Sequence, residues 1–201
     1  MGDGQVAKVA EWVRPRFDLK FDDLRDKRLF RCKSDEIASI RFERADGASF
    51  ALEKDDQGNW TISPPSDRAL KESVITRTVG GLSTLAGKDV VADDATTPAQ
   101  LAPWGLDSPA VEVEVRRADD STCGHALGAV IDPESESPRY YVKRADEGTV
   151  MSVPEYLYSR LDMVAGDFLA APPKDETAKE KTGSPTKGKN KKRGRKKAAA
   201  D

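Results

Sequence analysis

The sequence has few of the residues from which metal centres and disulfide frameworks are built: its 201 residues include two cysteines and one histidine. One histidine excludes a multi-histidine metal site, and two cysteines are too few for a four-thiolate zinc site. Long apolar runs are missing as well. No run approaches the roughly 20 residues that a membrane-spanning helix needs. The stretch from Met1 to Glu11 lacks the apolar segment of about 7–15 residues found in signal peptides. We therefore expect no transmembrane segment in this chain.

Charged residues are abundant, at 34% of the chain, but they are unevenly distributed. Residues 174–201 carry 11 basic and four acidic side chains, a net charge of +7, whereas residues 1–173 carry a net charge of −9. The basic segment contains no aromatic residue and no Val, Leu or Ile, so burial cannot offset the entropy of ordering it. We predict a disordered basic tail over residues 170–201, with the boundary at Ala170-Ala171-Pro172-Pro173.

The densest part of this tail places eight basic residues in eleven positions. Such a run attracts polyanions by releasing their counterions, but without aromatic residues it is not expected to read a base sequence. Nucleic acid, anionic lipid and cell-wall polymer are the candidate ligands, and a merely solubilising tail is the alternative. The tentative polyanion-binding residues are Lys187, Lys189, Lys191, Lys192, Arg193, Arg195, Lys196 and Lys197.

The first half of the body is predicted to be an antiparallel meander followed by a helix. Apolar and polar residues alternate over 40–44 and 50–54, which are joined through Asp46-Gly47, a pair favoured in tight hairpin turns. A third strand at 60–62 places Trp60 and Ile62 on one face. Next come a helix from about 70 to 85 and a short strand at 88–92.

That helix is predicted by the helical spacing of six residues: Leu70, Val74, Ile75, Thr78, Leu82 and Leu85. Its start is expected to be capped by Ser66 or Asp67, and Trp60 is expected to face its apolar side. Gly80-Gly81 would weaken it by about 1 kcal/mol per glycine. We attribute the two glycines to close packing of the helix on the sheet, with a helix kink as the alternative.

The second half repeats this plan. Alternation and turn residues predict strands at 111–115, 123–131, 140–143 and 149–153. A helix then begins at Pro154, and Gly128 is interpreted as a strand bulge. The apolar stripe expected on this helix consists of Tyr156, Leu157, Leu161 and Val164, with the stem of Arg160 at its margin. The fold class is thus α+β: two meander-plus-helix halves in one compact body, with a weak internal repeat between residues 18–92 and 105–169.

Three short motifs carry a family resemblance: Leu24-Arg25-Asp26-Lys27, Trp60 before Pro64-Pro65, and Gly105-Leu106-Asp107 before Pro109. On these motifs and their order, residues 18–169 resemble the bacterial family known as domain of unknown function 4340, and residues 1–17 form an N-terminal extension.

This resemblance implies a non-enzymatic accessory or scaffold role in the cell envelope. Family members often accompany ABC-transporter components similar to those linked with gliding motility, and they commonly follow an N-terminal membrane helix. This chain shows no such helix and no signal peptide, so its localisation stays open between the envelope and the cytoplasm. A protein partner is expected, without a clue to its identity.

Candidate catalytic groups are few. In Cys123-Gly124-His125, the cysteine and the histidine would share one face of a strand, as a nucleophile and its base require. We favour instead a small buried cysteine and a surface histidine. Cys32 is the other possible partner of Cys123, through a disulfide in an oxidising compartment, and sequence spacing does not decide this.

Adjacent carboxylates occur at Asp22-Asp23, Asp93-Asp94 and Asp119-Asp120, all beside predicted turns, where aspartate is favoured for its bonds to nearby backbone. Trp60 and Trp104 fit the packing of a sheet better than an aromatic binding site. The glycines match neither a phosphate-binding nor a dinucleotide-binding motif.

We therefore predict no catalytic, metal-binding or cofactor-binding residues, and no cofactor. The favoured function is a non-catalytic interaction module, the alternative is a polyanion-binding protein acting through its tail, and an enzyme ranks third.

Overall fold

The computed structural model describes residues 10–12 and 21–171. The chain divides into two units, 1–171 and 172–201, and all described residues belong to the first. Nearly all of the predicted disordered tail, with its eight tentative polyanion-binding residues, and most of the N-terminal extension lie outside the described residues. The domain boundaries proposed from the sequence therefore stay predictions.

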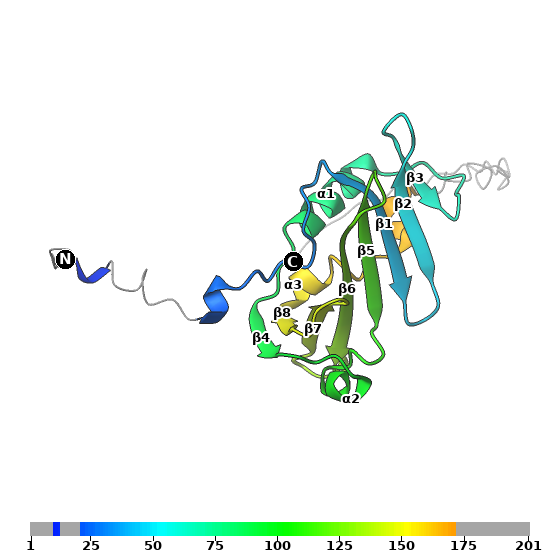
Figure 1. Cartoon of the computed structure of the whole chain (residues 1–201). Coiled ribbons are helices and arrows are strands. Elements are labelled where there is room, and N and C mark those ends of the chain that lie inside the picture. The colour runs from blue at the N-terminus through cyan, green and yellow to red at the C-terminus, as the bar shows by residue number, and fades with distance from the viewer. Residues whose placement is uncertain (1–9, 13–20, 172–201) are drawn as a thin grey trace, which may run out of the picture. The chain divides into compact units, whose positions relative to one another are not determined.

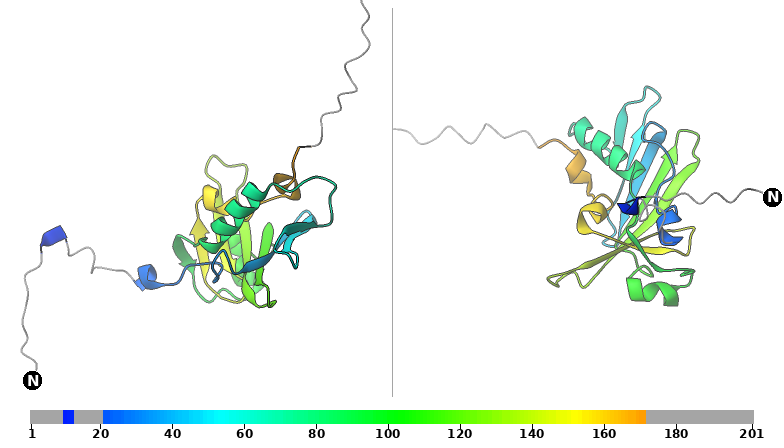
Figure 2. Two further views of the ribbon diagram at one scale, coloured as in Figure 1. Left: turned by 90° about the horizontal axis from the view of Figure 1, so that it is seen from above. Right: turned by 90° about the vertical axis from the view of Figure 1, so that its left-hand side faces the viewer.

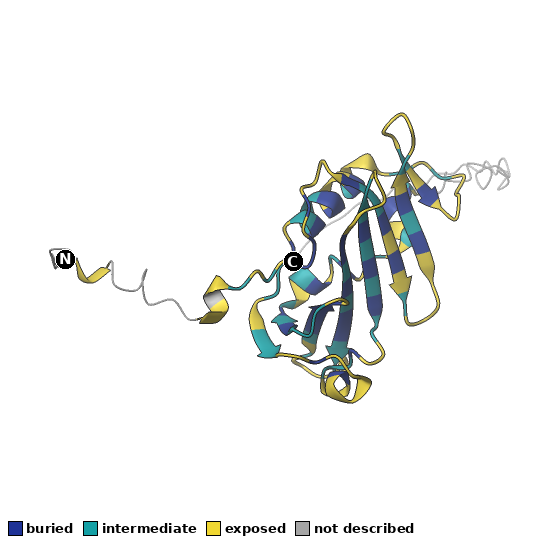
Figure 3. Ribbon diagram, in the orientation of Figure 1, coloured by how far each residue is buried: buried dark blue, intermediate teal, exposed yellow. Residues whose placement is uncertain are grey.

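The described residues form one antiparallel sheet of eight strands in the order β3-β2-β1-β5-β6-β7-β8-β4 (Figure 1). All eight predicted strands are present, and the α+β class is confirmed. Figure 3 shows buried and exposed residues alternating along β1 and β2, which is the pattern that allowed their prediction. The strands are β1 (Ile37–Arg44), β2 (Ser49–Lys54), β3 (Trp60–Ser63), β4 (Asp89–Ala92), β5 (Val111–Arg117), β6 (Thr122–Ile131), β7 (Arg139–Arg144) and β8 (Val150–Val153).

The two predicted meanders are parts of this single sheet, joined where β1 pairs with β5. Ile40 lies opposite Val115 and Phe42 opposite Val113, and all four side chains are fully buried. The strand that ends the first half, β4, does not stay with its own meander. It pairs with β8 at the far end of the sheet, so the two halves are interleaved.

Helix α1 (Glu72–Ser83) carries the chain from β3 at one edge of the sheet to β4 at the other (Figure 2). Its buried residues Ile75, Val79 and Leu82 join the main core, which includes Phe42 and Phe168. Two short helices, α3 (Glu155–Tyr158) and α4 (Ala165–Phe168), contribute to the same core.

A second, smaller cluster lies on the opposite face of the sheet. Leu127 and Ala129 of β6 belong to it, whereas their neighbour Ala126 belongs to the main core. This cluster is covered by the segment with helix α2 (Pro98–Leu101) and the 3₁₀ turn η3 (Ala102–Trp104). Trp104 meets the ring of Tyr141 edge-on, with 5.0 Å between ring centroids. The predicted packing role of Trp104 is confirmed.

Trp60 also packs, but at the margin of the main core. It is only partly buried, and the ammonium of Lys54 lies 5.2 Å from its ring centroid. Its strand neighbour Ile62 is buried, with 9% of its surface exposed. The free energy of unfolding lost in Trp60→Ala should therefore be smaller than the about 3–5 kcal/mol expected for complete burial.

The helix predictions need three corrections. The residue before α1 is Lys71, and no side chain caps this helix; Ser66 instead accepts a hydrogen bond from the backbone N–H of Arg68 within the preceding loop. The single helix predicted after Pro154 is broken into α3 and α4. As a result, Tyr156 and Val164 are exposed, at 67% and 44%, rather than in an apolar stripe.

The third helix correction concerns Gly80 and Gly81 of α1. The interpretation of Gly128, in strand β6, also needs correction. Close packing does not explain Gly80, because a side-chain carbon there would meet no atom within 4 Å, whereas at Gly81 it would touch the stem of Arg160 at 3.4 Å. Gly128 is paired regularly with Val111, so it marks no bulge. Tight contact explains it: a side-chain carbon would lie 2.9 Å from Val111 and 3.1 Å from Tyr158.

These two glycines predict mutational effects of opposite sign. Gly80→Ala should raise the free energy of unfolding by up to about 1 kcal/mol, because alanine favours helix and the space is free. Gly128→Ala should lower it by about 1–3 kcal/mol through overpacking. Urea denaturation of both variants beside the wild type measures this. Equal effects of the two substitutions would contradict the assigned packing.

Candidate interaction surface

One covalent bond fastens the N-terminal strap, residues 21–32, to the sheet. Cys32 and Cys123 form a disulfide with their Cα atoms 5.4 Å apart and 91 positions apart in sequence. The backbone N–H of Arg31 donates to the carbonyl of Cys123 at 2.8 Å, and Leu29 and Phe30 are fully buried beside the bond. Closing so long a loop is worth about 2–5 kcal/mol of stability. The sequence left this pairing open, and the structure decides it.

Cys123 is buried, as favoured from the sequence, and its disulfide with Cys32 explains why no cysteine–histidine couple forms. The β5–β6 pairing shifts between Val115 and Arg116, which leaves Cys123 as an extra residue in β6. Because of this bulge, Cys123 joins the main core, while the Nε2 atom of His125 lies 3.0 Å from a carboxylate oxygen of Glu112. The two side chains were expected on one face of the strand, but Cys123 lies in the main core and His125 contacts Glu112 instead.

Asp26 is the centre of an ion-pair network within the strap. Its carboxylate accepts hydrogen bonds from the guanidinium of Arg28 at 2.9 and 3.1 Å and from Arg31 at 3.1 Å. The hydrogen bond from the Arg28 side chain is the main reason that the pKa of Asp26 falls to about 2. Arg31 also reaches Glu147 at 2.9 Å, so the network connects the strap to the turn after β7.

The other residues of the Leu24-Arg25-Asp26-Lys27 motif fasten the strap near β4. Arg25 pairs with Asp93 at 2.7 Å, and the ammonium of Lys27 donates to the carbonyl of Lys88 at 2.9 Å. This motif therefore has an evident structural role, because its charged residues hold the strap beside one edge of the sheet.

Two of the three aspartate pairs, Asp93-Asp94 and Asp119-Asp120, lie at turns or bends as predicted, whereas Asp22-Asp23 lie in the 3₁₀ helix η2 (Phe21–Leu24). Asp94 and Asp120 have positive φ angles of 58° and 61°, a conformation that aspartate tolerates well. Asp119 accepts a hydrogen bond from the backbone of Ser121 at 3.0 Å. Across residues 10–12 and 21–171, no group of three or more His, Cys, Asp or Glu side chains could hold a metal ion, and no helix is long and apolar enough to cross a membrane.

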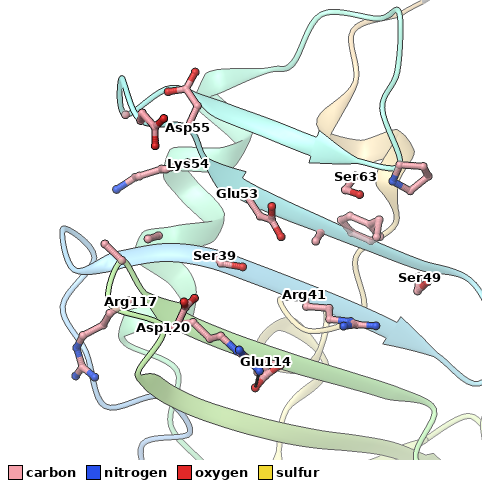
Figure 4. A pocket seen from close by; sticks show the side chains of 18 residues that line it. Ser39, Arg41, Ser49, Glu53, Lys54, Asp55, Ser63, Glu114, Arg117 and Asp120 are labelled. Atoms are coloured by element: carbon pink, nitrogen blue, oxygen red, sulfur yellow. Dashed lines mark hydrogen bonds and ion pairs between the residues drawn. The ribbon is translucent and has the colours of Figure 1, made fainter.

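The face of the sheet opposite α1 is open over β3, β2, β1 and β5, where it forms a hollow of about 950 Å³ (Figure 4). Small side chains lie along its floor, among them Ser39, Ala51 and Ser63. The β2–β3 and β5–β6 turns bound the hollow, and contribute Asp55 and Asp120. An antiparallel sheet commonly leaves one face to solvent, and this face is the polar one.

Four of the nine charged residues that line the hollow form ion pairs. Arg41 binds Glu43 at 2.7 Å, Arg116 binds Glu114 at 2.8 Å, and Arg117 binds Glu36 at 3.3 Å. Two further acidic residues of the lining, Glu53 and Asp56, make no ion pair or hydrogen bond through their carboxylates to any residue that the structure describes. The lining has five acidic and four basic side chains, and the ammonium of Lys54 lies over the Trp60 ring rather than in an ion pair with a described residue, so the hollow has a small excess of negative charge.

These features define a single-sheet α+β domain with a polar open face, a strap closed by a disulfide, and none of the catalytic or metal-binding groups that the sequence offered assembled among its described residues. The family model Domain of unknown function (DUF4340) matches residues 1–109, which is more than half of the chain. The chain belongs to this family.

The match confirms the resemblance seen in the sequence, and all three motifs that carried it lie within 1–109. It differs in extent, because the resemblance was expected over residues 18–169. No curated protein matches the chain, and no solved structure matches it.

The lowered pKa of Asp26 predicts how stability depends on pH. Because its folded pKa of about 2 lies below the value of about 3.9 for an unfolded aspartate, its contribution is present above pH ~4 and lost as the pH falls towards 2. Asp26→Asn should therefore destabilise the protein at pH 7 and change it little at pH 2.

Urea midpoints at both pH values measure this difference. The effect should be modest, since the Asp26 side chain is 38% exposed and solvent screens the pairs. Asp35→Asn is the matched control, because Asp35 is exposed and makes no ion pair or hydrogen bond through its side chain to the described part of the chain. The same loss at both pH values for Asp26→Asn would contradict the assignment.

Proposed function

We propose that this domain is a non-catalytic interaction module of a bacterial envelope assembly, placed on the oxidising side of the membrane. The observation that carries the proposal is the Cys32–Cys123 disulfide. Structural disulfides persist in secreted, periplasmic and surface proteins, whereas cytosolic thiols are kept reduced. Both cysteines are buried, with 9% and 3% of their surfaces exposed, which suits a structural bond rather than an exposed reactive one.

The accessory role in an ABC-transporter type of assembly is the finer part of this proposal. Its support is the membership of the DUF4340 family together with the associations that the resemblance implies. The candidate nucleophile Cys123 is committed to a disulfide, and two of the three aspartate pairs lie at turns or bends. What the domain offers a partner is surface: an open polar face and the edges of a sheet.

A second candidate function, polyanion binding, rests on the sequence of the tail alone. Eight basic residues in the eleven positions 187–197 would add an electrostatic attraction to nucleic acid, anionic lipid or cell-wall polymer. Under the main proposal this attraction supplements the binding of the body and does not replace it.

The state of the cysteines in cells tests the placement. Cells of the source bacterium are lysed directly into acid, and free thiols are labelled with a maleimide of high mass. We expect no label before reduction and two labels after it. In Cys32→Ser, the remaining Cys123 should take one label without reduction, which controls for access of the reagent. Two labels on the wild type without reduction would refute an oxidising location.

A salt series separates the body from the tail. Partners are captured with the full chain and with a chain that ends at Pro173, at about 0.1 M and 1 M salt, where the Debye length shrinks from about 10 Å to 3 Å. We expect both chains to retain the same partners at high salt. If removal of the tail abolishes every partner, polyanion binding is the main function and the proposal is wrong.

A further inference from the structure

One edge of the sheet, at β3, has main-chain groups without partners. At the turn before β3, the N–H of Asp55 donates to the carbonyl of Asn59 at 2.8 Å. Hydrogen-bonded and non-hydrogen-bonded pairs alternate along an antiparallel ladder. With Lys54 opposite Trp60 and Glu53 opposite Thr61, Thr61 and Ser63 bond to β2. The N–H and C=O groups of Trp60 and Ile62 therefore point outward.

These outward groups bind to no other residue in the described part of the chain. Unpaired groups along an edge strand are a template on which another strand can form. Two donors and two acceptors, spaced for one extended segment, are available along β3.

The opposite edge, β4, carries the devices by which proteins protect an edge. Its pairing with β8 is irregular between Val90 and Ala92, charged Lys88 and Asp89 stand at its start, and Lys27 of the strap reaches the carbonyl of Lys88. By contrast, β3 has the sequence Trp-Thr-Ile-Ser without a charge, and its register with β2 is unbroken. The two edges are therefore not equivalent.

The side chains along β3 also indicate which side chains an added strand would need. On the core side, Trp60 is only partly buried at the margin of the main core, so an apolar side chain of an added strand would complete its burial. On the open side, Thr61 and Ser63 are exposed, and Glu53 lies one strand further in with an unpaired carboxylate. Strands are about 4.8 Å apart, so a lysine or arginine opposite Thr61 can reach Glu53.

We propose that the β3 edge docks an extended segment of a partner protein as a ninth strand of the sheet. The segment has alternating character: an apolar residue towards Trp60 and a basic residue on the open side towards Glu53. Main-chain hydrogen bonds supply the affinity and these alternate side chains the specificity. The inference rests on the proposed role as an interaction module, and it names the surface and the chemistry of the partner.

The test uses random nine-residue peptides displayed on phage, selected against the full, oxidised chain. Selected peptides are synthesised and their affinity is measured by fluorescence anisotropy. Each is then N-methylated at one backbone position at a time. Since only alternate N–H groups of an added strand face β3 and β3 offers two outward carbonyls, methylation should weaken binding by about tenfold at two positions separated by one residue, and little at the position between them. Hydrogen exchange should show new protection at the amides of Trp60 and Ile62.

A matched pair of chain variants tests the same contact from the protein side. Ile62→Ala and Ile62→Pro both remove the buried side chain, but only the proline removes the outward N–H, and proline is tolerated at such an edge position. Ile62→Pro should bind the peptides about tenfold more weakly than Ile62→Ala. The methylation series remains decisive if the proline variant does not fold.

The proposal is overturned if no selected peptide shows the alternating response, if protection maps away from β3, or if the two Ile62 variants bind equally. A dimer in light scattering that Ile62→Pro dissociates would also overturn it, because the occupant would then be a second copy. Natural partners that the folded Ile62→Pro variant still captures would refute this edge and leave the interaction role intact. Free thiols in cells would instead refute the location and leave the edge intact.

Discussion

The pairing of β1 with β5 is the contact on which the rest of the architecture depends. It joins a three-strand meander to a four-strand meander, and the paired residues on its inner side are fully buried. Because the joined sheet has one continuous apolar face, a single helix, α1, can lie over it and carry the chain across to β4. The strap then closes the remaining apolar surface with Leu29 and Phe30. Neither half would bury its inner face alone.

Local patterns predicted the strands well, since each has alternation and a turn beside it, as Phe50 and Leu52 after Asp46-Gly47 show. Local patterns failed to predict the features that depend on contacts between residues distant in sequence. The disulfide needs the bulge at Cys123, which appears only when β5 pairs with β6. The same bulge moved Cys123 and His125 apart. At Gly128 the tight contact is made with Val111 and Tyr158. Both are distant in sequence, so local sequence does not distinguish this contact from the bulge that was predicted.

For the candidate interaction surface, the sequence predicts which residues share a strand face but not which strand forms the edge of the sheet. Trp60 and Ile62 could be placed on one strand face, but which strand would be an edge depended on where β4 inserts. Sequence order places β4 after α1, and nothing in its residues indicates pairing with β8. The free edge at β3 and the hollow above Ser39, Ala51 and Ser63 follow from this topology. The ion-pair network of Asp26 was equally unpredictable from local sequence, because it reaches the distant Glu147 through Arg31.

The inequality of the two edges limits what the domain can assemble into. A sheet with two open edges can add copies at both sides, and such head-to-tail addition yields open filaments. Here β4 is irregular, charged and fastened to the strap, while β3 is regular and uncharged. Strand addition is therefore favoured at the β3 side, where it would extend the sheet by one strand. The strap motif thus has a second consequence beyond stability: by protecting β4, it leaves the opposite edge, β3, as the place for the docking proposed above.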